Sequence, residues 1–156
     1  MVEKFLEYIT ESEKIIRTAD HIIYVTFPLI KDKKLLLKVL METKKSIVYC
    51  INAILQYEYL YKKIKLYKDA KTNLKTFIDK SSKRCKINNQ EINILLELFE
   101  LVEAHKTSPF EFIKGDKVFI LSENMKQEAV NLEKTKKFLS VAKEILKKTK
   151  NTIAKL

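Results

Sequence analysis

The sequence predicts an all-α protein, a bundle of four or five helices with one long central helix and a small β-hairpin, folded as a single domain over residues 1–156. Three observations predict this fold class. Apolar side chains recur at three- and four-residue spacing over long stretches of the chain. Among 156 residues there are only one Gly and two Pro, too few for a fold rich in tight turns. Hydrophobic residues make up 46% of the chain, which excludes a disordered protein and allows a sizeable core.

The longest periodic stretch, residues 35–67, contains neither Gly nor Pro and is expected to form the central helix. At 1.5 Å per residue this helix would be roughly 50 Å long, so several other helices could pack along it. Its apolar face is wider than the seam of a coiled coil, as a bundle core requires. The residues that share this face are Leu36, Leu40, Ile47, Cys50, Ile54, Tyr57, Tyr61 and Ile64.

The elements on either side of the central helix follow from the same spacing. The first helix is predicted over residues 2–24, and Pro28 is expected to end it because proline disfavours helical geometry in the preceding residue. A link over residues 29–34 leads to the central helix, with Asp32 as its N-cap. A short helix is predicted after the central one, over residues 69–79.

The second half of the chain is predicted to add two more helices. A loop over residues 81–89 precedes a helix over residues 89–105, which Asn88 and Glu91 are expected to start as a capping box. Apolar residues cover most of the circumference of this helix, so it should be buried on several sides. The last helix is predicted over residues 131–153.

Residues 110–121 break the helical period. Residues 112–120 are expected to form a β-hairpin, because β-branched and aromatic residues flank a turn that contains Gly115, the only glycine of the chain. An isolated hairpin is marginal in water, so this one should lean on the helices. Residues 122–130 are expected to be irregular or weakly helical.

The net charge of +11 is concentrated in two blocks. Residues 61–90 contain 10 basic and 2 acidic residues, and residues 134–156 contain 8 basic and 1 acidic residue. Between them, residues 91–133 contain 4 basic and 9 acidic residues. Part of the basic surface is expected to pair with an acidic helix face formed by Glu91, Glu97, Glu100 and Glu103.

The first basic block interleaves lysines with tyrosines. Lysines neutralise phosphates and release counterions, and tyrosines can stack on unpaired bases. The sequence therefore favours a non-enzymatic module that binds RNA or DNA through residues 59–86 and 134–155. The predicted contacts are Tyr59, Lys62, Lys63, Lys65, Lys68, Lys83, Arg84 and Lys86. Because arginine is scarce, with 2 residues against 29 lysines, a charged face that only keeps the protein in solution stays open as an alternative.

A second hypothesis is a protein–protein adaptor or a homodimer that uses the long helix or the hairpin as its contact. No apolar run is long enough to span a bilayer, so no membrane partner is expected. Cys50 and Cys85 are expected to be reduced thiols of a cytoplasmic protein. No cofactor and no metal site are expected, because the chain lacks the usual ligand spacings and any Gly-rich phosphate loop.

Arg17 and His21 are four residues apart and therefore share one helical face. The pair resembles the Arg-spacer-His motif of HEPN-domain ribonucleases, all-helical proteins that cleave RNA without a metal, although the spacer of three residues is shorter than in that family. The resemblance implies that His21 takes part in proton transfer and that Arg17 steadies the phosphate. A polar pair on a helix surface explains the same spacing without chemistry.

The plan of helix, long helix and helix, together with the stretch at residues 105–121, is similar to small archaeal helical proteins of uncharacterised function. This resemblance implies an archaeal cytoplasm and no particular activity. His105, at the end of its predicted helix, is expected to interact with the carbonyl groups exposed there.

Overall fold

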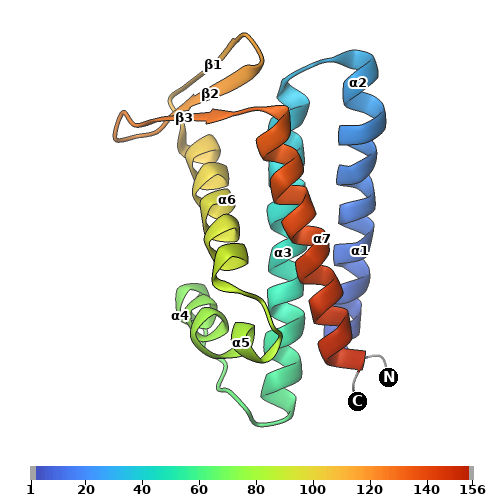
Figure 1. Cartoon of the computed structure of the whole chain (residues 1–156). Coiled ribbons are helices and arrows are strands. Elements are labelled where there is room, and N and C mark those ends of the chain that lie inside the picture. The colour runs from blue at the N-terminus through green and yellow to red at the C-terminus, as the bar shows by residue number, and fades with distance from the viewer. Residues whose placement is uncertain (1–2, 155–156) are drawn as a thin grey trace.

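The computed structural model describes residues 3–154 and shows long helices packed side by side, with a small sheet at one end (Figure 1). The prediction of a mostly helical protein with a hairpin is confirmed. The predicted start of the first helix at residue 2 and the basic residue Lys155 lie outside the described residues. The elements in chain order are α1 (Lys4–His21), α2 (Phe27–Ile30), α3 (Lys34–Leu60), α4 (Ala70–Thr76), α5 (Ser82–Arg84), α6 (Asn89–Thr107), β1 (Phe110–Lys114), β2 (Lys117–Leu121), β3 (Gln127–Val130) and α7 (Leu132–Ala154).

Helix α3 is the central helix, as predicted, and it packs against α1, α6 and α7. Five residues of the predicted face, Leu36, Leu40, Ile47, Cys50 and Ile54, are at most 1% exposed. Burying one such aliphatic side chain stabilises the fold by roughly 1.5–3 kcal/mol relative to exposing it. This one helix face therefore supplies the middle of the core.

Helix α3 ends at Leu60, so the prediction that it reaches residue 67 is wrong. Lys62 takes a left-handed conformation with φ 59°, and its N–H donates to the carbonyl of Tyr59 at 3.0 Å. The N–H of Lys63 donates to the carbonyl of Glu58 at 2.9 Å. These two bonds form a Schellman motif, which usually has glycine at the left-handed position. This helix end could not be predicted from the sequence, because a lysine occupies the position where glycine would have marked it.

The prediction that Pro28 ends the first helix is also wrong. Helix α1 passes into a π-helical turn over Ile22–Thr26 and continues as α2, so the helical backbone reaches Ile30. Pro28 has no N–H to donate within this continuous run, and the π-helical turn that directly precedes α2 is where the hydrogen-bond pattern changes. The helical run ends at Lys31, which has φ 58° and donates its N–H to the carbonyl of Phe27 at 2.7 Å.

The loop predicted over residues 81–89 is confined to residues 85–88, and the part before it is helical. A π-helical turn over Phe77–Ser81 joins α4 to α5, and Lys86, with φ 61°, closes this helical segment. The capping box that starts α6 is confirmed. The side chain of Asn88 accepts from the N–H of Glu91 at 2.8 Å, and the side chain of Glu91 accepts from the N–H of Asn88 at 3.0 Å.

The sheet has three antiparallel strands in the order β1-β2-β3. The predicted hairpin is confirmed, with a two-residue turn between Lys114 and Lys117 and Gly115 at φ +63°. Residues 122–130 are more ordered than predicted, because β3 extends the hairpin. Val118, Ile120 and Val130 turn to the core and are buried, so the sheet leans on the helices as expected.

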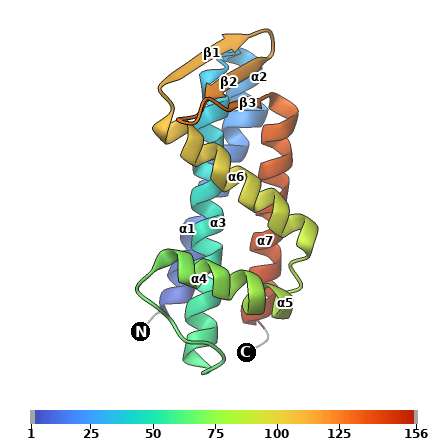
Figure 2. The ribbon, with the colours of Figure 1, turned by 90° about the vertical axis from the view of Figure 1, so that its left-hand side faces the viewer.

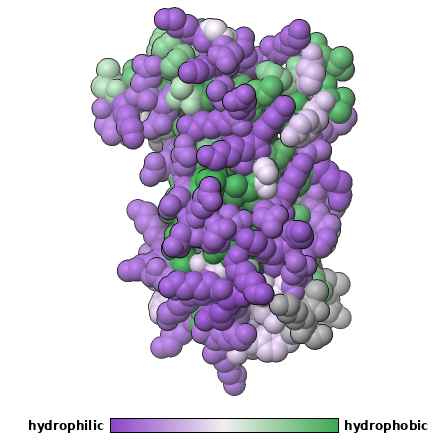
Figure 3. Space-filling model, viewed as in Figure 1, coloured by the Kyte–Doolittle hydropathy of each residue, from purple (hydrophilic) through white to green (hydrophobic). Residues whose placement is uncertain are grey.

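The two ends of the molecule differ. The sheet and α2 lie at one end, and α4, α5 and the C-terminal ends of α3 and α7 lie at the other (Figures 1 and 2). In the view of Figure 3 most of the surface is hydrophilic, and hydrophobic residues gather toward the end with the sheet and α2. Leu29 and Phe110 belong to the exposed apolar residues of this end. Within residues 3–154, no helix combines the length and the apolar character needed to cross a membrane.

Candidate nucleic-acid interface

The residues predicted to bind nucleic acid gather at the end of the bundle opposite the sheet (Figure 1). This end is built from the C-terminus of α3, the connection over residues 61–69, the short helices α4 and α5, and the C-terminal part of α7. We call it the basic end. Its members are Tyr59, Lys62, Lys63, Lys65, Lys68, Lys83, Arg84, Lys86, Lys147 and Lys148.

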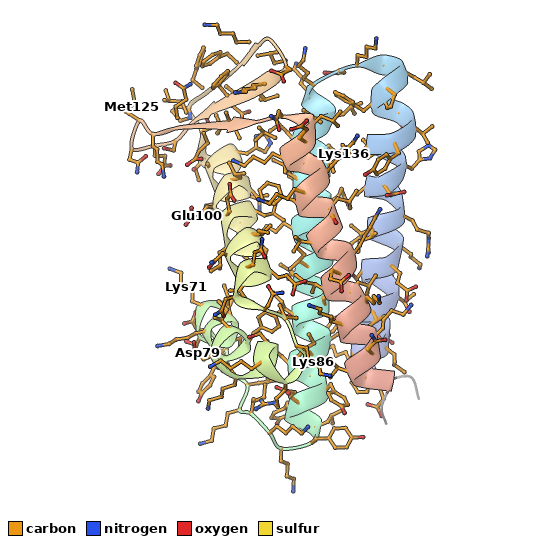
Figure 4. All side chains as sticks on the ribbon, viewed as in Figure 1. Lys71, Asp79, Lys86, Glu100, Met125 and Lys136 are labelled. Carbon is orange, nitrogen blue, oxygen red and sulfur yellow. The ribbon has the colours of Figure 1, made fainter. Side chains whose placement is uncertain are left out.

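A groove of about 470 Å³ at the basic end brings the two basic blocks of the sequence together. Arg84 and Lys86 line one wall, and Lys147 and Lys148 of α7 line the other. Figure 4 shows Lys86 beside the C-terminal part of α7. Glu144 also lines the groove, Arg84 is paired with Glu58, and Lys148 is paired with Glu91. Blocks that an acidic stretch separates along the chain thus meet in one groove, in which Lys86 and Lys147 are the lysines without a carboxylate partner among the described residues.

The connection after α3 is held in place by a side-chain clamp. The backbone N–H of Tyr67 donates to Asn73 Oδ1 at 2.9 Å, and Asn73 Nδ2 donates to the carbonyl of Tyr67 at 2.7 Å. Asp69 caps α4 by accepting from the N–H of Lys71 at 3.2 Å. The lysines of this connection therefore project from an ordered backbone.

Arg84 is held by a buried carboxylate. Its Nε donates to Glu58 Oε2 at 2.5 Å, and its Nη2 donates to Glu58 Oε1 at 2.7 Å. The hydroxyl of Ser81 also donates to Glu58 Oε1, at 2.5 Å. Burial would raise the pKa of Glu58, but the hydrogen bonds from Arg84 and Ser81 outweigh it and lower the pKa, so the carboxylate is charged at neutral pH.

The network around Glu58 fastens α5 to α3. The π-helical turn over Phe77–Ser81 ends at Ser81 and is followed directly by α5, which carries Arg84. The guanidinium of Arg84 thus has a structural partner, while 39% of its side chain surface stays exposed in the groove. Sequence reasoning missed this pair, because a glutamate on the rim of an apolar helix gives no signal of its burial.

The six lysines predicted to contact nucleic acid differ from Arg84 in their exposure and in their ion pairing. Lys62, Lys63, Lys65, Lys68, Lys83 and Lys86 are all exposed. Within residues 3–154, none of the six makes an ion pair with a carboxylate. Their ammonium groups are therefore available to an anionic ligand.

The predicted pairing between the acidic face of α6 and the second basic block is confirmed for two pairs. Lys134 lies 2.9 Å from Glu97, and Lys148 lies 2.6 Å from Glu91. Both lysines belong to α7, which packs against α6. The acidic stretch thus neutralises part of α7, whereas no lysine of residues 61–86 makes an ion pair with a carboxylate in the described part of the chain.

Three tyrosines at the basic end have rings that are about half exposed. Tyr59, Tyr61 and Tyr67 are 51%, 53% and 50% exposed. Tyr57 instead belongs to the core, where its ring meets that of Phe5 edge-on at a centroid distance of 5.7 Å. The predicted contact Tyr59 is therefore accessible to a ligand at the basic end.

No protein-family model, no curated protein and no solved structure matches this chain. The functional argument therefore rests on the chemistry and the geometry of the surface.

Arg17 and His21 lie on the exposed side of α1. In the part of the chain that the structure describes, no hydrogen bond joins the two side chains. Asp20, between them in the sequence, is bound by Lys143 of α7. The resemblance to HEPN-domain ribonucleases thus stays a prediction from the sequence.

His105 does more than end its helix. Its Nδ1 lies 2.6 Å from Glu111 Oε2, so the side chain joins the last turn of α6 to strand β1. The sequence predicted an interaction with the helix carbonyls, and the tertiary fold provides a carboxylate instead.

Both cysteines are buried and unoxidised. Burial raises the pKa of Cys50 to about 11, and it also raises the pKa of Cys85. Cys85 directly follows α5, between Arg84 and Lys86, and although it lines the groove it is only 3% exposed. Within residues 3–154, no three His, Cys, Asp or Glu side chains cluster as metal ligands would.

Proposed function

We propose that this protein is a non-enzymatic nucleic-acid-binding module that acts through the basic end. One observation carries the proposal: within residues 3–154 the six exposed lysines of the basic end make no ion pair, and they share this end with half-exposed tyrosines and with a groove that both basic blocks line. Unpaired cations bind phosphates and aromatic rings stack on unpaired bases, so this combination favours a nucleic-acid ligand.

The side chains favour single-stranded nucleic acid. Tyrosine rings stack on unpaired bases, and a stacked base within a duplex does not present its face to them. Lysine ammonium groups act as point charges on phosphates and lack the planar fork with which arginine reads guanine. The proposed binding is therefore directed to the backbone and to base stacking, with little dependence on sequence.

The first test is fluorescence anisotropy of labelled single-stranded RNA, duplex RNA and duplex DNA, titrated with protein at two salt concentrations. We expect the single strand to bind most tightly and its affinity to fall steeply with salt. Weak binding that is equal for all three nucleic acids and is removed by modest salt would contradict the proposal, and would mean that the lysines only keep the protein in solution.

Charge reversal maps the surface. The variant Lys65→Glu with Lys68→Glu changes two exposed residues of the connection after α3. We expect it to weaken binding by roughly tenfold or more, because two phosphate contacts are lost and two repulsions are introduced. Lys62 and Lys86 are left intact because they close helices in a left-handed conformation, and Arg84 is left intact because it holds Glu58.

The matched control is Lys106→Glu with Lys137→Glu. Both lysines are exposed and lie near the ends of α6 and α7 that face the sheet, so the net charge changes equally at the other end of the molecule (Figure 1). We expect less than a roughly threefold effect, from the long-range field alone. Equal losses for the two variants would show that net charge, and not the basic end, determines binding.

A further inference from the structure

A second surface lies at the opposite end of the molecule. A cleft of about 640 Å³ separates β1 from the N-terminal part of α3. Its apolar walls include Leu37 and Met41 of α3 and Ile113 and Val118 of the sheet. Figure 2 shows β1 at this end, above α3 and on the side of the sheet away from α7.

Strand β1 is an edge strand with an unpaired side. It is hydrogen-bonded only to β2. Lys114 and Lys117 flank a two-residue turn and form a hydrogen-bonded pair, and along an antiparallel ladder hydrogen-bonded and non-hydrogen-bonded pairs alternate. Glu111 and Ile113 therefore belong to non-hydrogen-bonded pairs, and their N–H and C=O groups point away from β2. Such an edge is a template for a further strand.

The cleft lies on the inner face of this edge. Side chains alternate between the two faces of a sheet, and Glu111 and Ile113 share the inner face with buried Val118 and Ile120. A strand added to β1 would continue that face, so every second side chain of the added strand would point toward α3. The cleft provides apolar space for those side chains.

The charges along the cleft are uneven. Lys34 and Lys38 of α3 are exposed, and within residues 3–154 neither has a carboxylate partner. At the other end Glu111 is bound by His105, and Glu42 is the second acid of the lining. The part of the cleft lined by Lys34 and Lys38 therefore favours a carboxylate.

We propose that the cleft binds an extended segment of a partner protein, which adds as a strand to β1. Its alternate apolar side chains enter the cleft, and an acidic side chain or a C-terminal carboxylate lies near Lys34 and Lys38. This proposal is independent of the nucleic-acid site.

A second copy of the chain fits the cleft less well. Paired with itself, β1 would bring Glu111 as its only carboxylate, and His105 already binds that group. Lys34 and Lys38 would then stay without a partner. The charge of the cleft thus favours a foreign acidic segment over a homodimer.

The test is selection of a displayed library of random decapeptides against the immobilised full chain. We expect enriched peptides to alternate apolar residues and to carry an acidic residue or a free C-terminus at one end. Each selected peptide is then titrated against the wild type and against Lys34→Glu with Lys38→Glu, for which we expect at least roughly tenfold weaker binding. Failure to enrich any peptide, or equal binding to both proteins, would overturn the proposal.

The pairing with β1 is tested from both partners. Ile113→Pro removes an outward N–H without removing a bond to β2, and Ile113→Val is its matched control. A second test does not depend on the folding of that variant. Two forms of a selected peptide are made, one N-methylated at its odd-numbered residues and the other at its even-numbered residues, so that only one form loses the N–H groups that would face β1. We expect that form not to bind and the other to bind as the unmodified peptide does; equal effects of the two modifications would overturn strand addition.

Two further measurements distinguish a partner segment from a second copy of the chain, and the cleft from the basic end. Sedimentation at several concentrations should show a monomer. A dimer that the Ile113→Pro substitution dissociates would show that a second copy occupies the cleft, and would overturn the proposal. The affinity for single-stranded RNA should differ less than roughly threefold between the wild type and the Lys34→Glu, Lys38→Glu variant, which would show that the larger loss of peptide binding is local to the cleft.

Discussion

Arg84 and Glu58, far apart in the sequence, form two charge-assisted hydrogen bonds of 2.5 and 2.7 Å at the basic end. Glu58 is 1% exposed, so this pair is largely shielded from solvent on one side. Arg84 thus has a structural partner, whereas within residues 3–154 Lys62, Lys63, Lys65, Lys68, Lys83 and Lys86 make no ion pair.

Removing the guanidinium should destabilise the protein. We expect Arg84→Met to lower the free energy of unfolding by about 2–3 kcal/mol, below the value for a fully buried pair because Arg84 is partly exposed. The cause is the buried carboxylate that is left unpaired. Urea denaturation measures the change. The double variant Glu58→Leu with Arg84→Met should recover much of the loss, and a single variant as stable as the wild type would contradict the structural role of the pair.

The same pair should make stability depend on pH. Hydrogen bonds from Arg84 and Ser81 lower the pKa of Glu58 in the folded protein in spite of its burial. The unfolded chain, in which the pKa of glutamate is about 4.3, therefore binds this proton at a higher pH than the folded protein does. The contribution is complete above about pH 5 and is lost as the pH falls through the folded-state pKa.

Urea titrations between about pH 6 and pH 3 check this linkage. We expect the free energy of unfolding of the wild type to fall more steeply with decreasing pH than that of Glu58→Gln. Parallel curves for the two proteins would show that Glu58 does not contribute as a charged group.

Replacing individual lysines of the basic end should reduce the salt dependence of nucleic-acid binding. For single strands, the logarithm of the binding constant falls against the logarithm of the salt concentration with a slope of about −0.7 per phosphate contact. We expect Lys65→Ala and Lys68→Ala each to reduce that slope by roughly 0.7, and Lys106→Ala to leave it unchanged. Anisotropy titrations over a salt series give the slopes. Unchanged slopes for the first two variants would remove these lysines from the interface.

The cysteines should react slowly in the folded protein. Burial raises the pKa of Cys50 to about 11 and also raises the pKa of Cys85, so thiolate is scarce and access is closed. Labelling with iodoacetamide, followed by mass spectrometry, should be slower by orders of magnitude than in denaturant. Cys85 should react before Cys50, because it follows the three-residue helix α5. Rapid labelling of Cys50 under native conditions would contradict the packing of α1 on α3.

Gly115 should be replaceable at a modest cost. Its φ is +63°, and a Cβ at this position would meet nothing within 4 Å, so the cost of a side chain comes from the backbone conformation alone. We expect Gly115→Ala to destabilise the protein by about 1 kcal/mol. Gly115→Asn should cost less, because asparagine tolerates the left-handed region. Thermal unfolding compares the two variants, and a larger loss for asparagine would show that space rather than backbone geometry limits the turn.

Helix ends show where sequence reasoning failed. Three helical segments close on lysines in the left-handed conformation, at Lys31, Lys62 and Lys86. Because glycine or asparagine usually marks such an end, the central helix was predicted seven residues too long. The capping box at Asn88 and Glu91 was predicted correctly, because both of its hydrogen bonds are local and its residue types are characteristic.

The candidate site also contains features that the sequence predicted and features that it could not predict. The composition of residues 61–86 indicated the exposed lysines and tyrosines, because the charge and the aromatic content of a segment are read directly from its sequence. The burial of Glu58 and the partial sequestration of Arg84 could not be predicted, because both follow from how a π-helical turn packs against α3. The third strand was missed because β3 has only 4 residues, too few for an alternating pattern to be recognised, and it pairs with β2 alone.

The sequence by itself determined the helical class, the central helix with its buried face, the hairpin at Gly115 and the clustering of positive charge. These depend on periodicity, turn chemistry and composition, which act over a few residues. Only the tertiary structure decided that two distant basic blocks share one groove, that Arg84 is bound to Glu58, and that β1 leaves an open edge above an apolar cleft. These relationships join residues far apart in the chain, and no local pattern encodes which of them will meet.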